Sequence, residues 1–118
     1  MTVTPATYDL TIYQGSDFNQ QVTFLQTEGG DPVNLENITF RMQIRPNKNS
    51  SNVLADLSSA NGKITQVDAT GVVTLSLTSV ETAAISSSGV YDIEAIRSAT
   101  SAERWLGGSV TLDTEVTR

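Results

Sequence analysis

The stretch Ile38-Thr39-Phe40-Arg41-Met42-Gln43-Ile44-Arg45 alternates apolar and polar residues without interruption. Successive side chains of a β-strand point to opposite faces of the sheet, so this period of two predicts a strand with one buried face. It is the clearest strand pattern in the sequence. We therefore predict that it lies centrally in a sheet, with Phe40 on the buried face.

Shorter alternations occur on both sides of this strand, at spacings of roughly ten residues, with turn signals between them. These turns are rich in Gly, Pro, Asn and Asp. The pattern favours an all-β, two-sheet sandwich of about seven or eight short antiparallel strands with at most one short helix. The expected strands cover residues 8–13, 18–24, 38–45, 53–57, 63–67, 73–77, 91–95 and 105–112, the last two as a hairpin.

Local signals between these strands lead to three further predictions. Asn61-Gly62 suits the positive φ angles of a two-residue hairpin turn between strands 53–57 and 63–67. Residues 79–85 are expected to form one or two helical turns, with Ser79 and Thr82 resembling a cap without an acidic partner. The polar run 46–52 is expected to be an exposed loop.

The length of 118 residues predicts a single domain spanning residues 1–118. Residues 1–6 are expected to be a flexible or partner-docking N-terminal arm. The sequence has neither a basic, apolar export signal at its start nor an apolar run of the ~20 residues that a membrane helix needs. We therefore expect a soluble chain.

Composition and charge narrow the classes of function. The 16 Thr and 13 Ser suit strands and turns, because Thr is stiff at χ1 and Ser bonds to nearby backbone. A net charge of -6 disfavours nucleic acid and membrane surfaces as partners, since both are anionic. The absence of His and Cys removes the commonest general base and the usual thiolate chemistry. We expect a protein that is not an enzyme, with no catalytic residue, metal or cofactor.

Carboxylates are the catalytic groups that remain, and the sequence offers one candidate catalytic pair and one candidate pair of calcium ligands. Asp92 and Glu94 stand two apart on one face of an expected strand, where a solvated outer face is the favoured interpretation because Tyr91 and Ile93 take the core face. Asp9 and Asp17 flank a Gly turn and supply oxygens of the kind that calcium prefers. They lack the closely spaced ligands of a calcium loop, so a turn role is favoured.

Arg104 and Trp105 are the interface candidates. If Leu106, Val110 and Leu112 face the core, strand parity turns Trp105 outward, although a bulge at Gly107-Gly108 would reverse that assignment. An exposed aromatic beside an arginine is typical of the energetic centre of a protein interface. The two residues are therefore predicted to anchor a partner.

The order of several short segments resembles the N-terminal domains of bacteriophage baseplate upper proteins and small tail-fibre attachment modules. The resemblance covers most of the chain, although those proteins continue beyond this domain. It implies an immunoglobulin-like sandwich without an active site that docks on other phage structural proteins. The segments are Ile12-Tyr13-Gln14-Gly15-Ser16-Asp17-Phe18, Gly30-Asp31-Pro32-Val33-Asn34-Leu35, Ile44-Arg45, Gly89-Val90-Tyr91-Asp92-Ile93-Glu94, Leu106-Gly107-Gly108-Ser109-Val110-Thr111-Leu112 and Glu115-Val116-Thr117-Arg118.

The expected function is that of a virion protein, made in the host cytoplasm, that joins the tail baseplate or fibre to its neighbours. Multiple copies in a symmetric assembly are expected, with baseplate, fibre or tail proteins as partners. One alternative is a head or neck decoration protein, since β-sandwiches also decorate capsids. Another is a carbohydrate-binding module, for which an exposed Trp and a polar Asn-rich loop would be needed.

Overall fold

The predicted central strand forms β4 (Thr39–Arg45), which pairs antiparallel with β5 (Ala55–Ser58) on one side and β8 (Gly89–Ser98) on the other. The computed structural model describes residues 6–26 and 30–117. In β4 the apolar residues are buried and the polar ones reach the surface, as the alternation predicted. The central position of this strand and the burial of Phe40 are thus confirmed.

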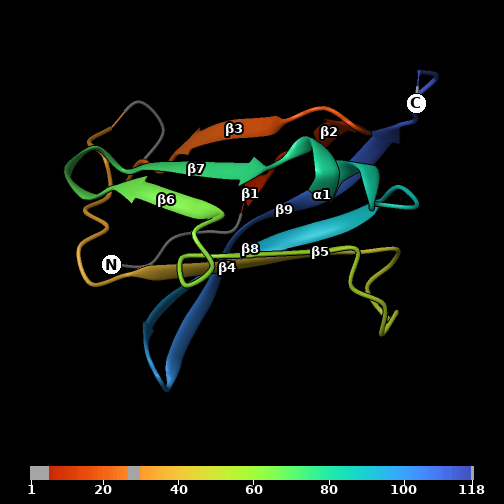
Figure 1. The fold of residues 1–118 in the computed structure, drawn as a ribbon. Helices are drawn as coiled ribbons and strands as arrows, with labels where there is room; N and C mark the ends of the chain where they lie inside the picture. The colour runs from red at the N-terminus through yellow and green to blue at the C-terminus, as the bar shows by residue number, and fades with distance from the viewer. Residues whose placement is uncertain (1–5, 27–29, 118) are drawn as a thin grey trace.

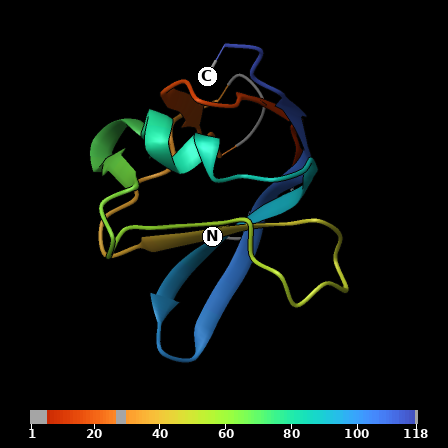
Figure 2. The ribbon, with the colours of Figure 1, turned by 45° about the vertical axis from the view of Figure 1, so that its right-hand side comes forward.

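The larger of two sheets contains β4 and has six strands in the order β1-β9-β8-β4-β5, with β2 also beside β9. The predicted C-terminal hairpin is formed by β8 and β9 (Ser101–Asp113), whose tip extends away from the second sheet (Figures 1 and 2). Both β1 (Ala6–Thr7) and β2 (Leu10–Tyr13) pair with β9 in parallel. The expectation of purely antiparallel strands is therefore wrong for this edge. Of the predicted arm, residues 1–5 lie outside the described residues, and Ala6 belongs to β1.

The second sheet has three strands in the order β3-β7-β6. They are β3 (Phe18–Thr23), β7 (Val72–Leu77) and β6 (Ile64–Val67), all paired antiparallel. Figure 1 shows this sheet as a layer above the larger one. Apolar residues of both sheets form one core cluster, so the all-β, two-sheet prediction is confirmed.

The hairpin predicted at Asn61-Gly62 is wrong. Gly62 does have a positive φ of 79°. However, β5 pairs with β4 and β6 pairs with β7, so this turn carries the chain from one sheet to the other. The local residue preference correctly indicated a turn, but strand pairing is decided by burial in the two sheets.

Helical structure is limited to η1 (Asp68–Thr70) and α1 (Ser79–Ala83) within the described residues. The helical turns predicted in segment 79–85 are confirmed, but the cap is Thr78 rather than Ser79. Thr78 accepts a hydrogen bond from the Glu81 N–H, and the Glu81 carboxylate accepts one from the Thr78 N–H. Lys63, and then Thr78, hold the pKa of Glu81 below its ordinary value. Neither helix is long and apolar enough to cross a membrane.

The centre of the core is a group of three aromatic rings, which joins the two sheets. Phe24 and Phe40 are stacked with centroids 6.1 Å apart, and Trp105 meets both edge-on at 5.1 and 5.7 Å. Such geometry is favoured because the positive edge of one ring faces the negative face of another. Trp105 is fully buried.

The outward placement predicted for Trp105 is therefore wrong, and a β-bulge is the reason. Ile93 is opposite Leu106, whereas the next residue of β8, Glu94, is opposite Arg104. Trp105 is the extra residue, so Trp105 and Leu106 are both buried although they are consecutive. The bulge lies just before the Gly pair rather than at it. The arginine over the Trp105 ring is Arg97, at 5.8 Å from the centroid.

Replacing Phe40 by Ala should lower the free energy of unfolding by about 3–5 kcal/mol, because the cavity left in the core loses apolar contacts. Thr39→Ala is the matched control on an exposed position of the same strand and should change it by less than about 0.5 kcal/mol. Urea unfolding of both variants gives the comparison. A loss below about 1 kcal/mol for Phe40→Ala would contradict its central place in the core.

For Trp105→Ala we expect a loss of about 3–5 kcal/mol in unfolding free energy, against less than about 0.5 kcal/mol for Arg104→Ala. Trp105→Phe should cost less than Trp105→Ala, since it keeps an aromatic ring in the core. Both variants remove the buried Nε1 donor, which has no partner among the described residues. Thermal and urea unfolding measure all three. If Trp105→Ala left the unfolding free energy nearly unchanged, Trp105 would not be in the core.

Candidate functional site

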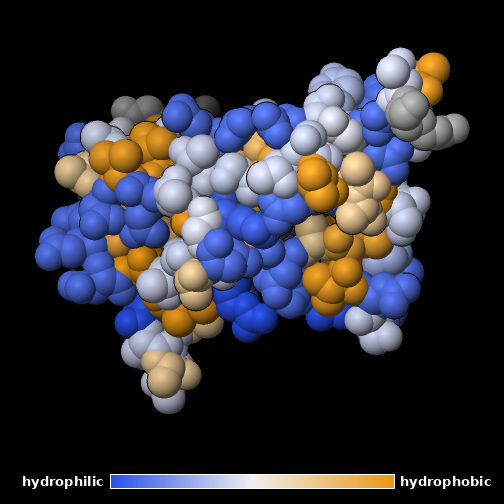
Figure 3. Space-filling model, in the orientation of Figure 1, coloured by the Kyte–Doolittle hydropathy of each residue, from blue (hydrophilic) through white to orange (hydrophobic). Residues whose placement is uncertain are grey.

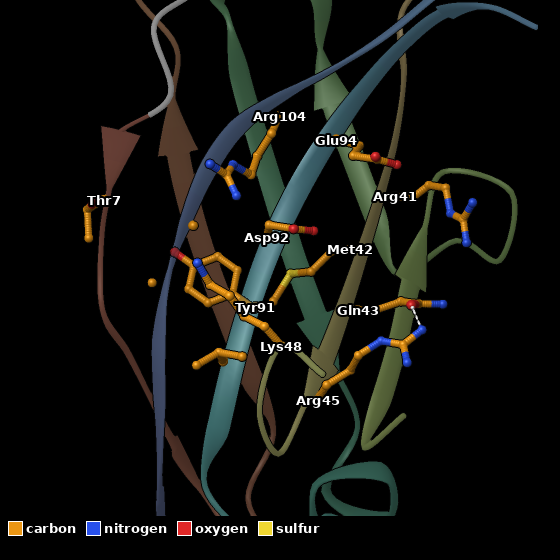
Figure 4. Close-up of a pocket in the computed structure, with 13 residues that line it drawn as sticks. Thr7, Arg41, Met42, Gln43, Arg45, Lys48, Tyr91, Asp92, Glu94 and Arg104 are labelled. Atoms are coloured by element: carbon orange, nitrogen blue, oxygen red, sulfur yellow. Dashed lines mark hydrogen bonds between the residues drawn. The ribbon is translucent and has the colours of Figure 1, made fainter. Parts of the chain in front are cut away.

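The outer face of the six-stranded sheet is hollowed over β4, β8 and β9. The hollow has a volume of about 630 Å³, within the range of about 300–1,000 Å³ found for ligand sites. We call it the charged hollow. The six charged residues that line it are Arg41, Arg45, Lys48, Asp92, Glu94 and Arg104 (Figure 4).

Strand register brings three of these side chains into one row. Glu94 on β8 is opposite Arg41 on β4 and opposite Arg104 on β9. Because neighbouring strands lie about 4.8 Å apart, the backbones of the two arginines are about 10 Å apart, with Glu94 on the strand between them. The row therefore has two positive charges for one negative charge.

The row beside it is Gln43, Asp92 and Gly107. Arg45 extends along β4 and donates hydrogen bonds to the Gln43 Oε1 at 2.8 Å and the Ser50 carbonyl at 2.7 Å. Figure 4 shows this Gln43–Arg45 contact at the edge of the hollow. The second contact also ties Arg45 to the loop 46–52, which is largely exposed as predicted and supplies Lys48.

Gly107 and Gly108 line the hollow from β9. Gly107 is opposite Asp92 on the outer face, and its lack of a side chain lowers the surface between the charged residues. Gly108 is also required by packing, because a Cβ there would lie 2.5 Å from the Tyr8 carbonyl oxygen. The close approach of the chain between β1 and β2 thus explains one glycine of the pair.

Tyr91 lies beneath the hollow and holds the segment between β1 and β2 close to β9. Its hydroxyl donates a hydrogen bond of 2.5 Å to the Tyr8 carbonyl, joining β8 to the segment between β1 and β2. Burial, and then the negative charges of Asp9 and Tyr8, raise the pKa of Tyr91 from 10.0 to about 12. The Ser109 N–H donates to Asp9 at 3.0 Å and holds the pKa of that carboxyl below its ordinary value.

The structure separates the two interface candidates. Arg104 is exposed and lines the hollow, whereas Trp105 lies in the core behind it. The sequence did not indicate that Arg41, Arg45 and Lys48 would join Arg104. The available signals were the outward parity of Arg41 and Arg45 on β4 and the place of Lys48 in the exposed loop that follows it.

The two pairs of carboxylates predicted as candidates from the sequence lie in different parts of the structure. Asp92 and Glu94 both line the hollow, on the outer face that parity predicted. Asp9 and Asp17 accept hydrogen bonds from the backbone N–H groups of Ser109 and Ser79, respectively. No group of three or more acidic, His or Cys side chains within residues 6–26 and 30–117 is placed to hold a metal ion.

No protein-family model matches the sequence, and no curated protein is significantly similar to it.

The raised pKa of Tyr91 predicts a loss of stability in alkali. The folded state holds the phenolic proton more tightly than the unfolded state, so this contribution is complete below pH 10.0 and is lost as the pH rises toward about 12. Tyr91→Phe should remove that part of the pH dependence. Urea unfolding of both proteins at several alkaline pH values checks this prediction. An equal change of unfolding free energy with pH in the two proteins would contradict it.

Proposed function

We propose that the chain is a non-enzymatic structural protein of a bacteriophage virion, most simply a tail baseplate or fibre-attachment component that works by protein–protein assembly. The resemblance of its ordered segments to such modules motivates the proposal. The structural observation that supports an assembly role is the exposed edge of β3. Its partners would be neighbouring virion proteins, with several copies arranged symmetrically.

β3 is a long edge strand without the usual protection. It pairs only with β7 among the described residues, and Phe18–Thr23 contains no charge and no proline. Soluble proteins normally shorten, charge or cover such edges, because free N–H and C=O groups recruit another strand. An unprotected edge of six residues suits the addition of a strand from a partner.

The other three sheet edges show that protection. β5 is four residues long, and the Asn61 side chain donates to its Asp56 carbonyl and accepts from its Ser58 N–H. β6 is equally short and lies between Lys63 and Asp68. The β1–β2 edge is interrupted at Tyr8 and Asp9, and β2 is only four residues long. The contrast makes β3 the edge best suited to pairing.

The surface around this edge is suited to polar contacts. Figure 3 shows hydrophobic residues on the visible face in separate areas with hydrophilic residues between them. Obligate interfaces are more apolar, whereas edge pairing obtains affinity from main-chain hydrogen bonds. Weak single contacts would suffice in a symmetric particle, because attachment at one site raises the effective concentration at the others.

We also propose an immunoglobulin-like topology. The strand order supports it: β9-β8-β4 and β3-β7-β6 follow the two-sheet order of that fold, with β5 as an added strand next to β4. In this correspondence the N-terminal strands would take the place of its first strand, but they lie beside β9 instead of beside β3. The single Trp differs from antibody domains in lying on the last strand rather than on the third.

The alternatives have less support. The carbohydrate-binding module relied on an exposed Trp105, which is buried. A head or neck decoration protein would use the same kind of domain, and no feature of the structure favours it over a tail component.

The proposal is tested on particles released by the strain that carries the gene. Purified particles should contain the chain in a constant ratio to the major tail protein, and dissociation should leave it with tails. Quantitative mass spectrometry of the fractions measures both. Its absence from particles would overturn the virion proposal, and recovery with heads would replace the tail assignment by the decoration alternative.

A matched pair of variants tests the edge. Gln21 on β3 and Thr65 on β6 are both exposed and both opposite Thr74 on β7. Gln21→Lys should reduce incorporation into particles by about tenfold, because an edge lysine opposes strand addition, and Thr65→Lys should leave it unchanged. Circular dichroism confirms that both fold. Equal incorporation of the two variants would show that β3 is not the assembly edge.

A further inference from the structure

The charged hollow contains positive charges that the protein does not neutralise. Four of the seven Lys and Arg residues line it, in a chain of net charge -6. The ion pairs among the described residues are Lys63–Glu81 and Arg97–Glu103, both outside the hollow. Within the part of the chain that the structure describes, the side chains of Arg41, Lys48 and Arg104 have no hydrogen-bond or ion-pair partner.

This arrangement separates charge across the molecule. The hollow has four cations against Asp92 and Glu94, a local excess of positive charge, whereas most acidic side chains lie elsewhere. Cations at close spacing raise the local potential and attract a negatively charged group. Three of the four are arginines, whose planar forks suit carboxylates.

We propose that the charged hollow binds a carboxylate-bearing polypeptide segment of a partner protein. This surface is on the other sheet from the β3 edge and is a second, independent docking site. The inference goes beyond the proposed function and holds whether or not the chain is a virion protein. The occupant is acidic in sequence and lies across β4, β8 and β9.

The two carboxylates in the hollow decide between an acidic polypeptide and a uniform polyanion. Glu94 lies between Arg41 and Arg104, and Asp92 lies in the next row. A chain with a negative charge on every unit would meet both carboxylates and be repelled. A polypeptide places carboxylates at the arginines and offers backbone N–H groups to Asp92 and Glu94.

The shape of the hollow suits a segment rather than a flat surface. Its volume is about 630 Å³. The bare Gly107 allows a backbone to approach the sheet opposite Asp92, and Arg104 lies on the same strand beside it (Figure 4). Arg45 is held in place by Gln43 and Ser50 and so needs less ordering on binding.

The test uses the full chain and two labelled peptides, one in which Glu alternates with Ser and one in which Gln replaces each Glu. Fluorescence anisotropy at low and physiological salt measures the affinities. The Glu peptide should bind at least about tenfold more tightly than the Gln peptide, since charge-assisted hydrogen bonds are the stronger ones. Polyphosphate serves as the uniform polyanion.

Variants locate the site. Arg41→Gln with Arg104→Gln should weaken binding of the Glu peptide by about tenfold or more. Lys63→Gln with Arg97→Gln removes the same charge outside the hollow and should weaken it by less than about threefold, through long-range attraction alone. Glu94→Gln should strengthen binding of polyphosphate more than binding of the Glu peptide, because only polyphosphate meets the Glu94 carboxylate with a negative charge. Glu81→Gln, outside the hollow, should leave both affinities nearly unchanged. Thermal unfolding confirms that each variant is folded.

Three outcomes would overturn the inference. Equal losses for the two double variants would show general charge attraction instead of a site. Tighter binding of polyphosphate than of the Glu peptide would make the occupant a polyanion. Self-association of the chain that the Arg41 and Arg104 changes abolish, without peptide binding, would make the occupant a second copy. None of these results depends on whether the chain is found in particles.

Discussion

The β-bulge at Trp105 is the constraint on which both the core and the outer face depend. It turns two consecutive residues of β9 toward the interior, so the indole completes the aromatic group with Phe24 and Phe40. In a regular strand, Trp105 would stand opposite Glu94 on the outer face. The bulge puts Arg104 there instead. One inserted residue thus joins the two sheets and supplies a cation to the charged hollow.

The hollow and the bulge are linked through β9. After the bulge, Gly107 lies opposite Asp92 on the outer face, where a larger residue would fill the space between the charges. Gly108 accommodates the Tyr8 carbonyl, which also accepts the Tyr91 hydroxyl. Gly107 therefore deepens the outer face, and Gly108 allows the parallel docking of the N-terminal strands.

The two proposed docking surfaces differ in their physics. The β3 edge is uncharged and has no strand partner on its outer side within residues 6–26 and 30–117, so it would select partners by geometry and main-chain hydrogen bonds. The charged hollow would select by charge, which influences association rate and specificity more than affinity. Because they belong to different sheets, both can be occupied at once.

Periodicity in the sequence by itself determined the all-β class, the central β4 and the buried side of Phe40, and local capping signals determined the helical turns near residue 80. Each of these depends on neighbours in the chain. Local preference at Asn61-Gly62 predicted the turn but not its partners. Only the tertiary structure decided the burial of Trp105, because a bulge is a property of two paired strands. It alone assembled Arg41, Lys48 and Arg104 into one surface, since no local pattern encodes the pairing of β4, β8 and β9 that brings these distant residues together.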